Sequence, residues 1–148
     1  MARILVVDDN PDIRLLVSTI LEDEGHDVTV AIDGRDALRI LDDENPDVIV
    51  LDVMMPEMDG YGVLRQLRAT GRASKARVLM LTAKNHEADW LRGYQSGANQ
   101  YLTKPFDPEE LIEAVEKLVR MDPNQLTSFR QDELDRAQLL SRLESLLG

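Results

Sequence analysis

The sequence predicts a doubly wound α/β fold, in which helices cover both faces of one parallel sheet. Two observations lead to this prediction. Short apolar runs of strand length alternate with amphipathic stretches of helix length, and the central run, Val48–Leu51, lies between two prolines with no polar alternation. Such a run is typical of a strand buried on both faces. Right-handed crossovers between parallel strands then place helices on both sides of the sheet.

Five strands are expected along the chain. Each is a short apolar run followed by polar or turn-forming residues. The expected strands are Ile4–Val7, Val28–Ile32, Val48–Leu51, Val78–Leu81 and Tyr101–Leu102.

A helix is expected after each strand, because apolar residues recur there at intervals of three and four. The first begins at Asn10, a favourable N-cap that a proline follows. The fourth, around Trp90 and Tyr94, has the weakest pattern. The fifth has the clearest start, since Asp107 and Glu110 form the sequence signature of a capping box.

A proline at position 123 ends the fifth helix, so we divide the chain into a domain at residues 1–121 and an extension at 122–148. Leucines recur at helical spacing in the extension: Leu139, Leu140, Leu143, Leu146 and Leu147. This pattern predicts an amphipathic helix that either docks on the domain or pairs with another protein.

Composition excludes several classes of function. The chain of 148 residues has no cysteine, so it has neither disulfides nor a thiolate site. Its net charge of −11 disfavours binding to nucleic-acid phosphates, and we expect no direct DNA binding. No apolar stretch is long enough to span a membrane, and Met1-Ala2-Arg3 leads into a strand rather than a signal peptide. We therefore expect a cytoplasmic protein without a membrane partner.

The residues at the strand ends carry the chemistry. Asp8, Asp9, Asp52, Thr82 and Lys104 all follow or end expected strands, so they should meet at one edge of the parallel sheet. Carboxylates at close quarters repel one another unless a cation lies among them. Oxygen ligands without histidine or cysteine suit a hard ion, Mg²⁺ or Mn²⁺. A hydroxyl and an ammonium beside them would bind an incoming phosphoryl group, with Asp52 as the carboxylate nucleophile.

Four sequence blocks closely resemble the receiver domain of two-component response regulators. They are Val6-Val7-Asp8-Asp9, Leu51-Asp52-Val53-Met54-Met55-Pro56 with Asp59-Gly60, Leu81-Thr82-Ala83, and Gly97-Ala98 with Tyr101-Leu102-Thr103-Lys104-Pro105-Phe106. The resemblance covers residues 3 to 120. It implies a flavodoxin-like (βα)5 fold with sheet order 2-1-3-4-5 and a site at the switch between strands 1 and 3.

The resemblance also implies roles for the site residues. Asp52 would be the phospho-acceptor, and Asp9 and Asp52 would bind the metal directly, with Asp8 acting mainly through water. Met54 would contribute its backbone carbonyl. Thr82 would be the switch hydroxyl, Lys104 the phosphate-binding lysine in a cis bond to Pro105, and Tyr101 the switch aromatic.

The expected function is therefore signalling rather than enzymatic turnover of a separate substrate. A sensor histidine kinase or a histidine phosphotransfer protein would supply the phosphoryl group to Asp52. The switch would alter the face made by the fourth helix, the fifth strand and the fifth helix, which would then bind a downstream protein target. We expect a monomer, or a weak dimer that pairs through the C-terminal helix.

Three alternatives stay open. The chain could be a docking module that is never phosphorylated, acting through its surface and C-terminal helix. A flavin or nucleotide binder is disfavoured because no glycine-rich loop follows the first strand. An aspartate-based phosphohydrolase usually has a second acid two residues after its nucleophile, and Met54 occupies that position.

Overall fold

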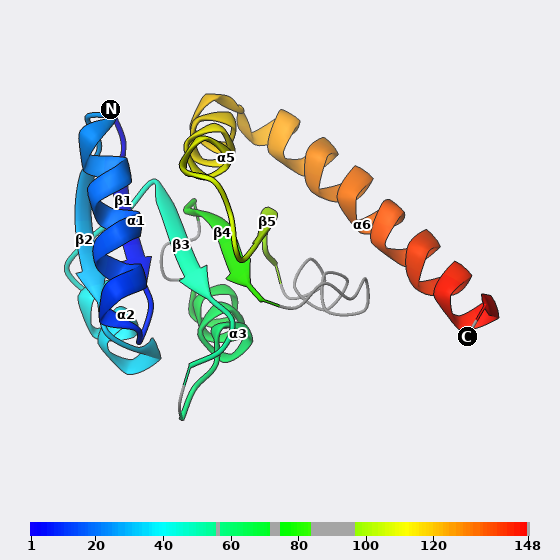
Figure 1. Ribbon diagram of the computed structural model, residues 1–148, viewed down its shortest axis with the longest axis horizontal. Helices are drawn as coiled ribbons and strands as arrows, with labels where there is room; N and C mark the ends of the chain where they lie inside the picture. Colours follow the sequence, from blue (N-terminus) through cyan, green and yellow to red (C-terminus); the bar gives the residue numbers. More distant parts are fainter. Residues whose placement is uncertain (56, 72–74, 84–96, 148) are drawn as a thin grey trace.

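The parallel sheet predicted from the sequence is present in the computed structural model, which describes residues 1–55, 57–71, 75–83 and 97–147. The strands are β1 (Arg3–Val7), β2 (Asp27–Ala31), β3 (Val48–Asp52), β4 (Arg77–Thr82) and β5 (Gln100–Thr103). All pair in parallel in the order β2-β1-β3-β4-β5, which is the predicted order (Figure 1). The fold prediction is confirmed.

The described helices are α1 (Pro11–Asp23), α2 (Gly34–Ile40), α3 (Gly60–Thr70), α5 (Pro108–Arg120) and α6 (Pro123–Leu147). Local chemistry explains where they begin. The side chain of Asn10 accepts hydrogen bonds from the first amides of α1, and the side chain of Asp59 accepts one from the amide of Gly62 in α3. Glu110 accepts the amide of Asp107 at 3.1 Å at the start of α5. The expected helix around Trp90 and Tyr94 lies outside the described residues.

Two apolar layers hold the helices on the sheet. One face of the sheet packs against α2 and α3, and its core includes Leu5, Ile49, Leu51, Leu64 and Met80. The opposite face packs against α1 and α5, and its core includes Val6, Val50, Leu79, Leu111 and Leu118. Alternate residues of each central strand therefore enter opposite layers, as expected for strands buried on both faces.

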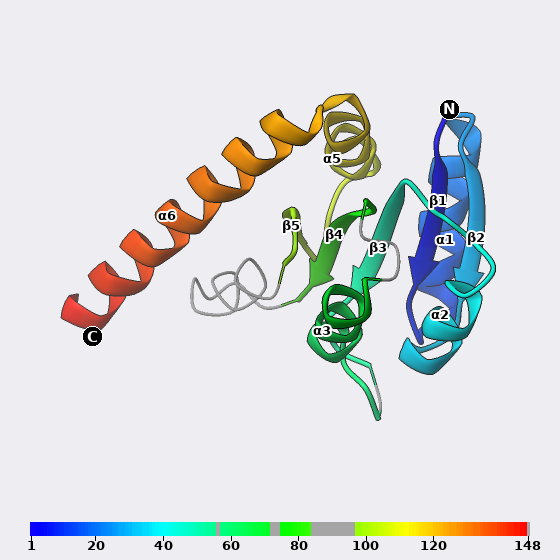
Figure 2. The ribbon, with the colours of Figure 1, turned by 180° about the vertical axis from the view of Figure 1, so that it is seen from behind.

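The C-terminal extension is one helix, α6, which leaves the end of α5 and passes on the β5 side of the sheet (Figures 1 and 2). Leu126 packs against the core layer beneath α1 and α5, and Ala137 is buried. Lys117 of α5 lies 4.2 Å from the ring centre of Phe129. The first part of α6 is thus attached to the domain.

The leucine stripe predicted for the extension does not form that attachment. Leu139, Leu143, Leu146 and Leu147 are exposed, by 44% to 89%. The buried or half-buried residues of α6 include Leu126, Phe129, Leu134 and Ala137, which lie outside the stripe. Leu140 is the one leucine of the stripe that is half-buried. Most leucines of the stripe are therefore exposed to solvent.

Among the described residues, no helix combines the length and the apolar character needed to cross a membrane.

Candidate functional site

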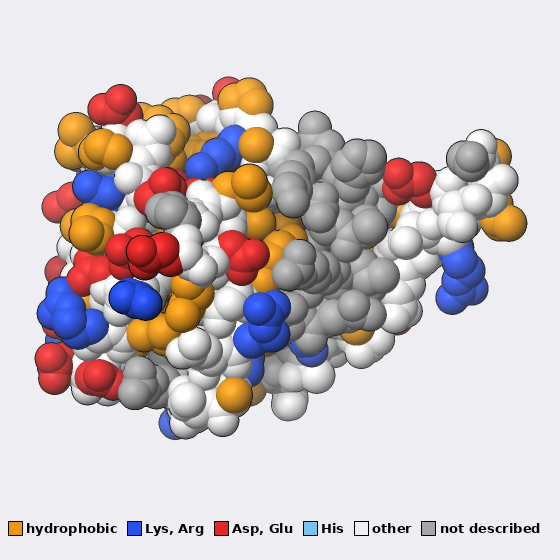
Figure 3. Space-filling view, turned by 90° about the horizontal axis from the view of Figure 1, so that it is seen from below, with side chains coloured by type: hydrophobic (Ala, Val, Ile, Leu, Met, Phe, Trp, Pro, Cys, Tyr) orange, Lys and Arg blue, Asp and Glu red, His pale blue; other side chains and the backbone are white. Residues whose placement is uncertain are grey.

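The predicted acidic residues lie together at the carboxyl edge of the sheet. Asp8 and Asp9 directly follow β1, and Asp52 is the last residue of the neighbouring strand β3. One oxygen from each of the three carboxylates can be chosen so that all lie within 4.8 Å of one another. Figure 3 views this edge from below and shows acidic side chains gathered toward the part of the molecule that contains β1, β2 and β3.

Lys104 reaches this cluster from the end of β5, the edge strand on the far side of β4 from Asp52. It follows β5, and its amide donates to the carbonyl of Thr82 at 2.7 Å, which holds the chain beside the end of β4. The bond between Lys104 and Pro105 is cis. The ammonium Nζ lies 3.1 Å from Oδ1 of Asp52 and 3.2 Å from Oδ2 of Asp8. One lysine therefore bridges two acids that come from different strands.

Burial makes the electrostatics of this cluster strong. Asp8 and Asp52 are 1% and 4% exposed, whereas Asp9 is exposed. Desolvation, and then the charge of Asp8, raise the pKa of Asp52 to about 6, although Lys104 opposes this rise. Burial lowers the pKa of Lys104, but the charges of Asp52 and Asp8 outweigh burial and hold it above its ordinary value. The cluster therefore carries an excess of negative charge that one ammonium does not neutralise.

The donor set fits a hard divalent cation. The carboxylate oxygens of Asp8, Asp9 and Asp52 converge, and within the described part of the chain no histidine or cysteine joins them. Met54, predicted to contribute its carbonyl, lies two residues beyond Asp52, and its backbone amide is among the groups that oppose the raised pKa of Asp52. In receiver domains such an acidic pocket generally binds Mg²⁺. The assignment of individual ligands stays a prediction.

The two predicted switch residues occupy β4 and β5. Thr82 is fully buried at the end of β4, one position beyond Leu81, which pairs with Asp52. Tyr101 on β5 is half-buried and packs against the core layer beneath α2 and α3. The structure thus places Thr82 near the acidic edge and Tyr101 in contact with the interior.

Sequence reasoning missed Tyr61, the buried second residue of α3. Its hydroxyl forms a hydrogen bond with the hydroxyl of Tyr101 across 40 residues of sequence. No local pattern signals this pairing, because Tyr61 reads as an ordinary core residue of an amphipathic helix. Asp59 caps α3 and Gly60 begins it directly before Tyr61, but neither residue signals the contact with Tyr101.

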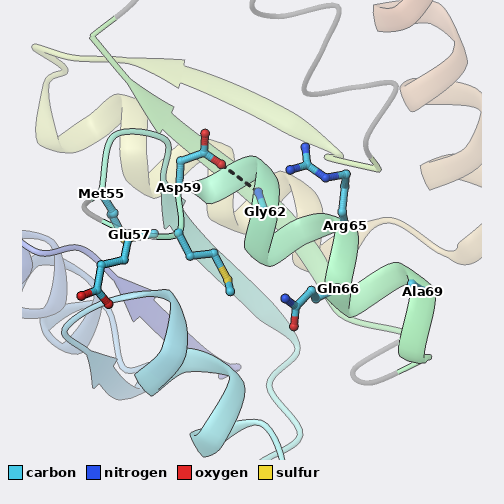
Figure 4. Close-up of a pocket in the computed structure, with 8 residues that line it drawn as sticks. Met55, Glu57, Asp59, Gly62, Arg65, Gln66 and Ala69 are labelled. Atoms are coloured by element: carbon cyan, nitrogen blue, oxygen red, sulfur yellow. Dashed lines mark hydrogen bonds between the residues drawn. The ribbon is translucent and has the colours of Figure 1, made fainter.

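A separate hollow lies on the outer side of α3, outside the acidic cluster (Figure 4). Its lining includes Met55, Glu57, Asp59, Arg65 and Gln66. The hydrogen bond drawn there joins the Asp59 carboxylate to the Gly62 amide at 2.9 Å and caps α3. None of the predicted site residues lines this hollow, so we assign it no part in the chemistry at Asp52.

Comparison with known proteins agrees with this geometry. Residues 4–116 match the family model described as the response regulator receiver domain. The chain is 46% identical over 120 residues to the DNA-binding dual master transcriptional regulator RpaA of a Synechocystis strain, covering 81% of this chain and 50% of RpaA. It is also 46% identical over 114 residues to an uncharacterized 14.6 kDa protein of Leptolyngbya boryana, covering 77% of this chain and 87% of that protein.

Solved structures give the same result. The chemotaxis protein CheY4 of Vibrio cholerae superposes with a TM-score of 0.76 at 37% identity, covering 80% of this chain and 98% of CheY4. The BeF3-activated DrrB receiver domain superposes with a TM-score of 0.74 at 36% identity, covering 82% of this chain and 99% of that domain. The chain spans about half the length of RpaA, so the expectation that it does not bind DNA directly stays a prediction. On the strength of the family match, the fold and the acidic edge, the chain belongs to the response regulator receiver domains of two-component systems.

Proposed function

We propose that Asp52 accepts a phosphoryl group from a phosphohistidine of a sensor histidine kinase or a histidine phosphotransfer protein. The observation that supports this most directly is the meeting of three carboxylates with Lys104 at one edge of the sheet. A nucleophilic carboxylate, a fixed cation and oxygen ligands for a metal are the groups that phosphoryl transfer requires.

In the proposed step, an Oδ atom of Asp52 forms a bond to phosphorus as the bond between phosphorus and the histidine nitrogen breaks. The imidazole leaves with the electron pair of that bond and takes up a proton. Lys104, already 3.1 Å from Asp52, offsets the negative charge of the phosphoryl oxygens. A divalent cation held by Asp8, Asp9 and Asp52 would supply Lewis-acid stabilisation of the same charge.

Two residues would report the modification. The hydroxyl of Thr82 would donate a hydrogen bond to the new phosphoryl group, and the space it leaves would favour an inward position of Tyr101. This is a shift between two packings of β4 and β5, biased by local charge. Tyr101 and Thr103 line a hollow together with Glu133 and Arg136 of α6. A movement of Tyr101 would therefore also alter the contact between β5 and the extension.

The role is that of a signalling phospho-acceptor which promotes its own phosphorylation and dephosphorylation. We propose that its output is contact with a downstream protein. The transcriptional regulators among its relatives, such as RpaA, are about twice as long as the matched region. Their DNA binding is therefore not carried over to the residues described.

The test is phosphorylation of the wild type and of Asp52→Asn by acetyl phosphate or a kinase with Mg²⁺, read by a phosphate-affinity gel and intact-mass spectrometry. We expect the wild type to gain one phosphoryl group and Asp52→Asn to gain none. Asp43→Asn, which makes the same charge change at an exposed carboxylate remote from the site, is the matched control and should behave as the wild type. Equal uptake by Asp52→Asn would move the acceptor elsewhere, and no uptake by any form would favour the docking module.

A further inference from the structure

A second charged site lies at the opposite edge of the sheet, near the amino ends of β4 and β5. A cavity of about 910 Å³ there is bounded by α3, by the segments that lead into β4 and β5, and by the first turns of α6. Among the lining residues that the structure describes, four are basic: Arg68, Lys75, Arg77 and Arg130. Asp47 is the one acid in this described lining, whose formal charge is therefore +3. This concentration of positive charge occurs in a chain whose net charge is −11.

Backbone contacts fix two of these guanidiniums without neutralising them. Arg68 donates to the carbonyls of Gly97 at 2.7 Å and Ala76 at 3.4 Å, and Arg77 donates to the carbonyl of Met121 at 2.7 Å. Carbonyl oxygens orient a guanidinium but carry no formal charge. Among residues 1–55, 57–71, 75–83 and 97–147, no carboxylate forms an ion pair with Arg68, Lys75 or Arg77.

Two further observations indicate that the positive charge of the cavity lining is not fully compensated, which would favour binding of an anion. Nε of Arg77 is buried and has no hydrogen-bond partner within the described part of the chain, so the protein compensates the charge of this guanidinium only in part. Burial, and then the charge of nearby Arg130, lower the pKa of Arg68. Two guanidiniums held this close repel each other, and an anion among them would relieve that repulsion.

The shape of the cavity favours a small molecule over a strand of polymer. Its volume lies within the range of about 300–1,000 Å³ that is usual for small-ligand sites. The cations surround one space instead of following a strip across the surface. Pro123 and Leu126 of α6 and Ala76 of the domain add an apolar wall to the same space. Arginine forks suit phosphate oxygens because they can donate two parallel hydrogen bonds.

We propose that this cavity binds a phosphate-bearing small molecule between the receiver domain and α6. The ligand would place its phosphates among Arg68, Arg77 and Arg130 and rest its less polar part against the apolar wall of α6. Because Thr127 and Arg130 belong to α6, the bound molecule would also fasten the extension to the domain. The proposal is independent of phosphorylation at Asp52, which lies at the other edge of the sheet.

The test is isothermal titration calorimetry of the full chain with ATP and, separately, with sodium triphosphate. EDTA is included so that no divalent cation can hold the probe at the acidic edge. We expect saturable one-site binding that weakens as salt is raised. Arg130→Glu and, independently, Lys75→Glu should weaken binding by about tenfold or more, because each reverses a charge that faces the ligand. Circular dichroism checks that each variant remains folded.

Arg142→Glu is the matched control, since it makes the same change on an exposed part of α6 outside the cavity. It should bind as the wild type does, within about twofold. The proposal is overturned if neither probe binds, or if Arg142→Glu weakens binding as much as Arg130→Glu. Binding of an acidic peptide such as hexaglutamate in preference to both probes would also overturn it, since the site would then belong to a protein partner.

Discussion

Gly60, the first residue of α3, lies against the end of β3, and substituting it tests how tightly these two elements are packed. A Cβ atom added at Gly60 would lie 2.4 Å from the backbone oxygen of Asp52 and 3.0 Å from both Met80 Cε and Val53 Cα. Backbone atoms, unlike the end of a flexible side chain, cannot move aside locally. Reaching even 3.0 Å requires a displacement of at least 0.6 Å (3.0 minus 2.4) between α3 and the end of β3.

We expect Gly60→Ala to lower the free energy of unfolding by about 1–3 kcal/mol, the usual cost of forcing a methyl group into a filled interior. With a urea m-value of about 1–3 kcal/mol/M, the midpoint should fall by roughly 1 M. Because the displaced atom belongs to Asp52, we also expect slower phosphorylation in the folded protein. Urea titration followed by circular dichroism measures the first effect, and a timed acetyl phosphate reaction measures the second.

Gly62→Ala is the control on the same helix. Its added Cβ would meet the side chains of Met58 at 3.0 Å and Asp59 at 3.5 Å, which can adjust. Alanine is also the better helix former by about 0.5–1 kcal/mol, so this variant should be as stable as the wild type or slightly more stable. A Gly60→Ala protein with an unchanged urea midpoint would refute the reasoning, because the close approach of Gly60 to Asp52 would then have no effect on the free energy of unfolding.

Two further predictions concern the site and its switch. Tyr61→Phe removes the hydroxyl pair with Tyr101 and should cost about 0.5–1.5 kcal/mol in urea unfolding, while leaving Asp52 able to accept phosphate; an unchanged midpoint would show that the pair adds no stability. Lys104→Met removes the charge that opposes the raised pKa of Asp52, so in EDTA that pKa should rise above about 6. The folded state then binds its proton more tightly than the unfolded state, and stability should fall as pH rises through that value. Urea midpoints at pH 5 and pH 8 measure this, and equal losses relative to the wild type at both would contradict it.

Much of the fold could be predicted because local and long-range signals agree. Val48–Leu51 is apolar at every position, and the structure buries all of it between two helical layers. Asn10 and Asp59 lie where helices begin, and their side chains cap those helices. The acidic edge followed from the same reasoning, since parallel strands bring their carboxyl ends to one side. The meeting of Asp8, Asp9 and Asp52 was therefore a consequence of topology.

The remaining features depend on contacts that no local pattern records. The leucines of the extension have the spacing of a buried stripe, yet spacing alone does not say which side of a helix meets a neighbour. The structure attaches α6 through Leu126 and Phe129 instead. The basic cavity is similar, because Arg130 lies 55 residues beyond Lys75 and no charge run in the sequence joins it to Arg68 and Lys75.

The contact of α6 with the domain over more than half of its length has a mechanical consequence. Glu133 and Arg136 line a hollow with Tyr101, and Ala137 is buried, whereas Leu143, Leu146 and Leu147 are exposed to solvent. At 1.5 Å per residue, the part of α6 after Leu140 extends about 10 Å beyond these contacts. This short rigid arm would follow any displacement of β5, and its exposed leucines would pass that movement to a bound protein.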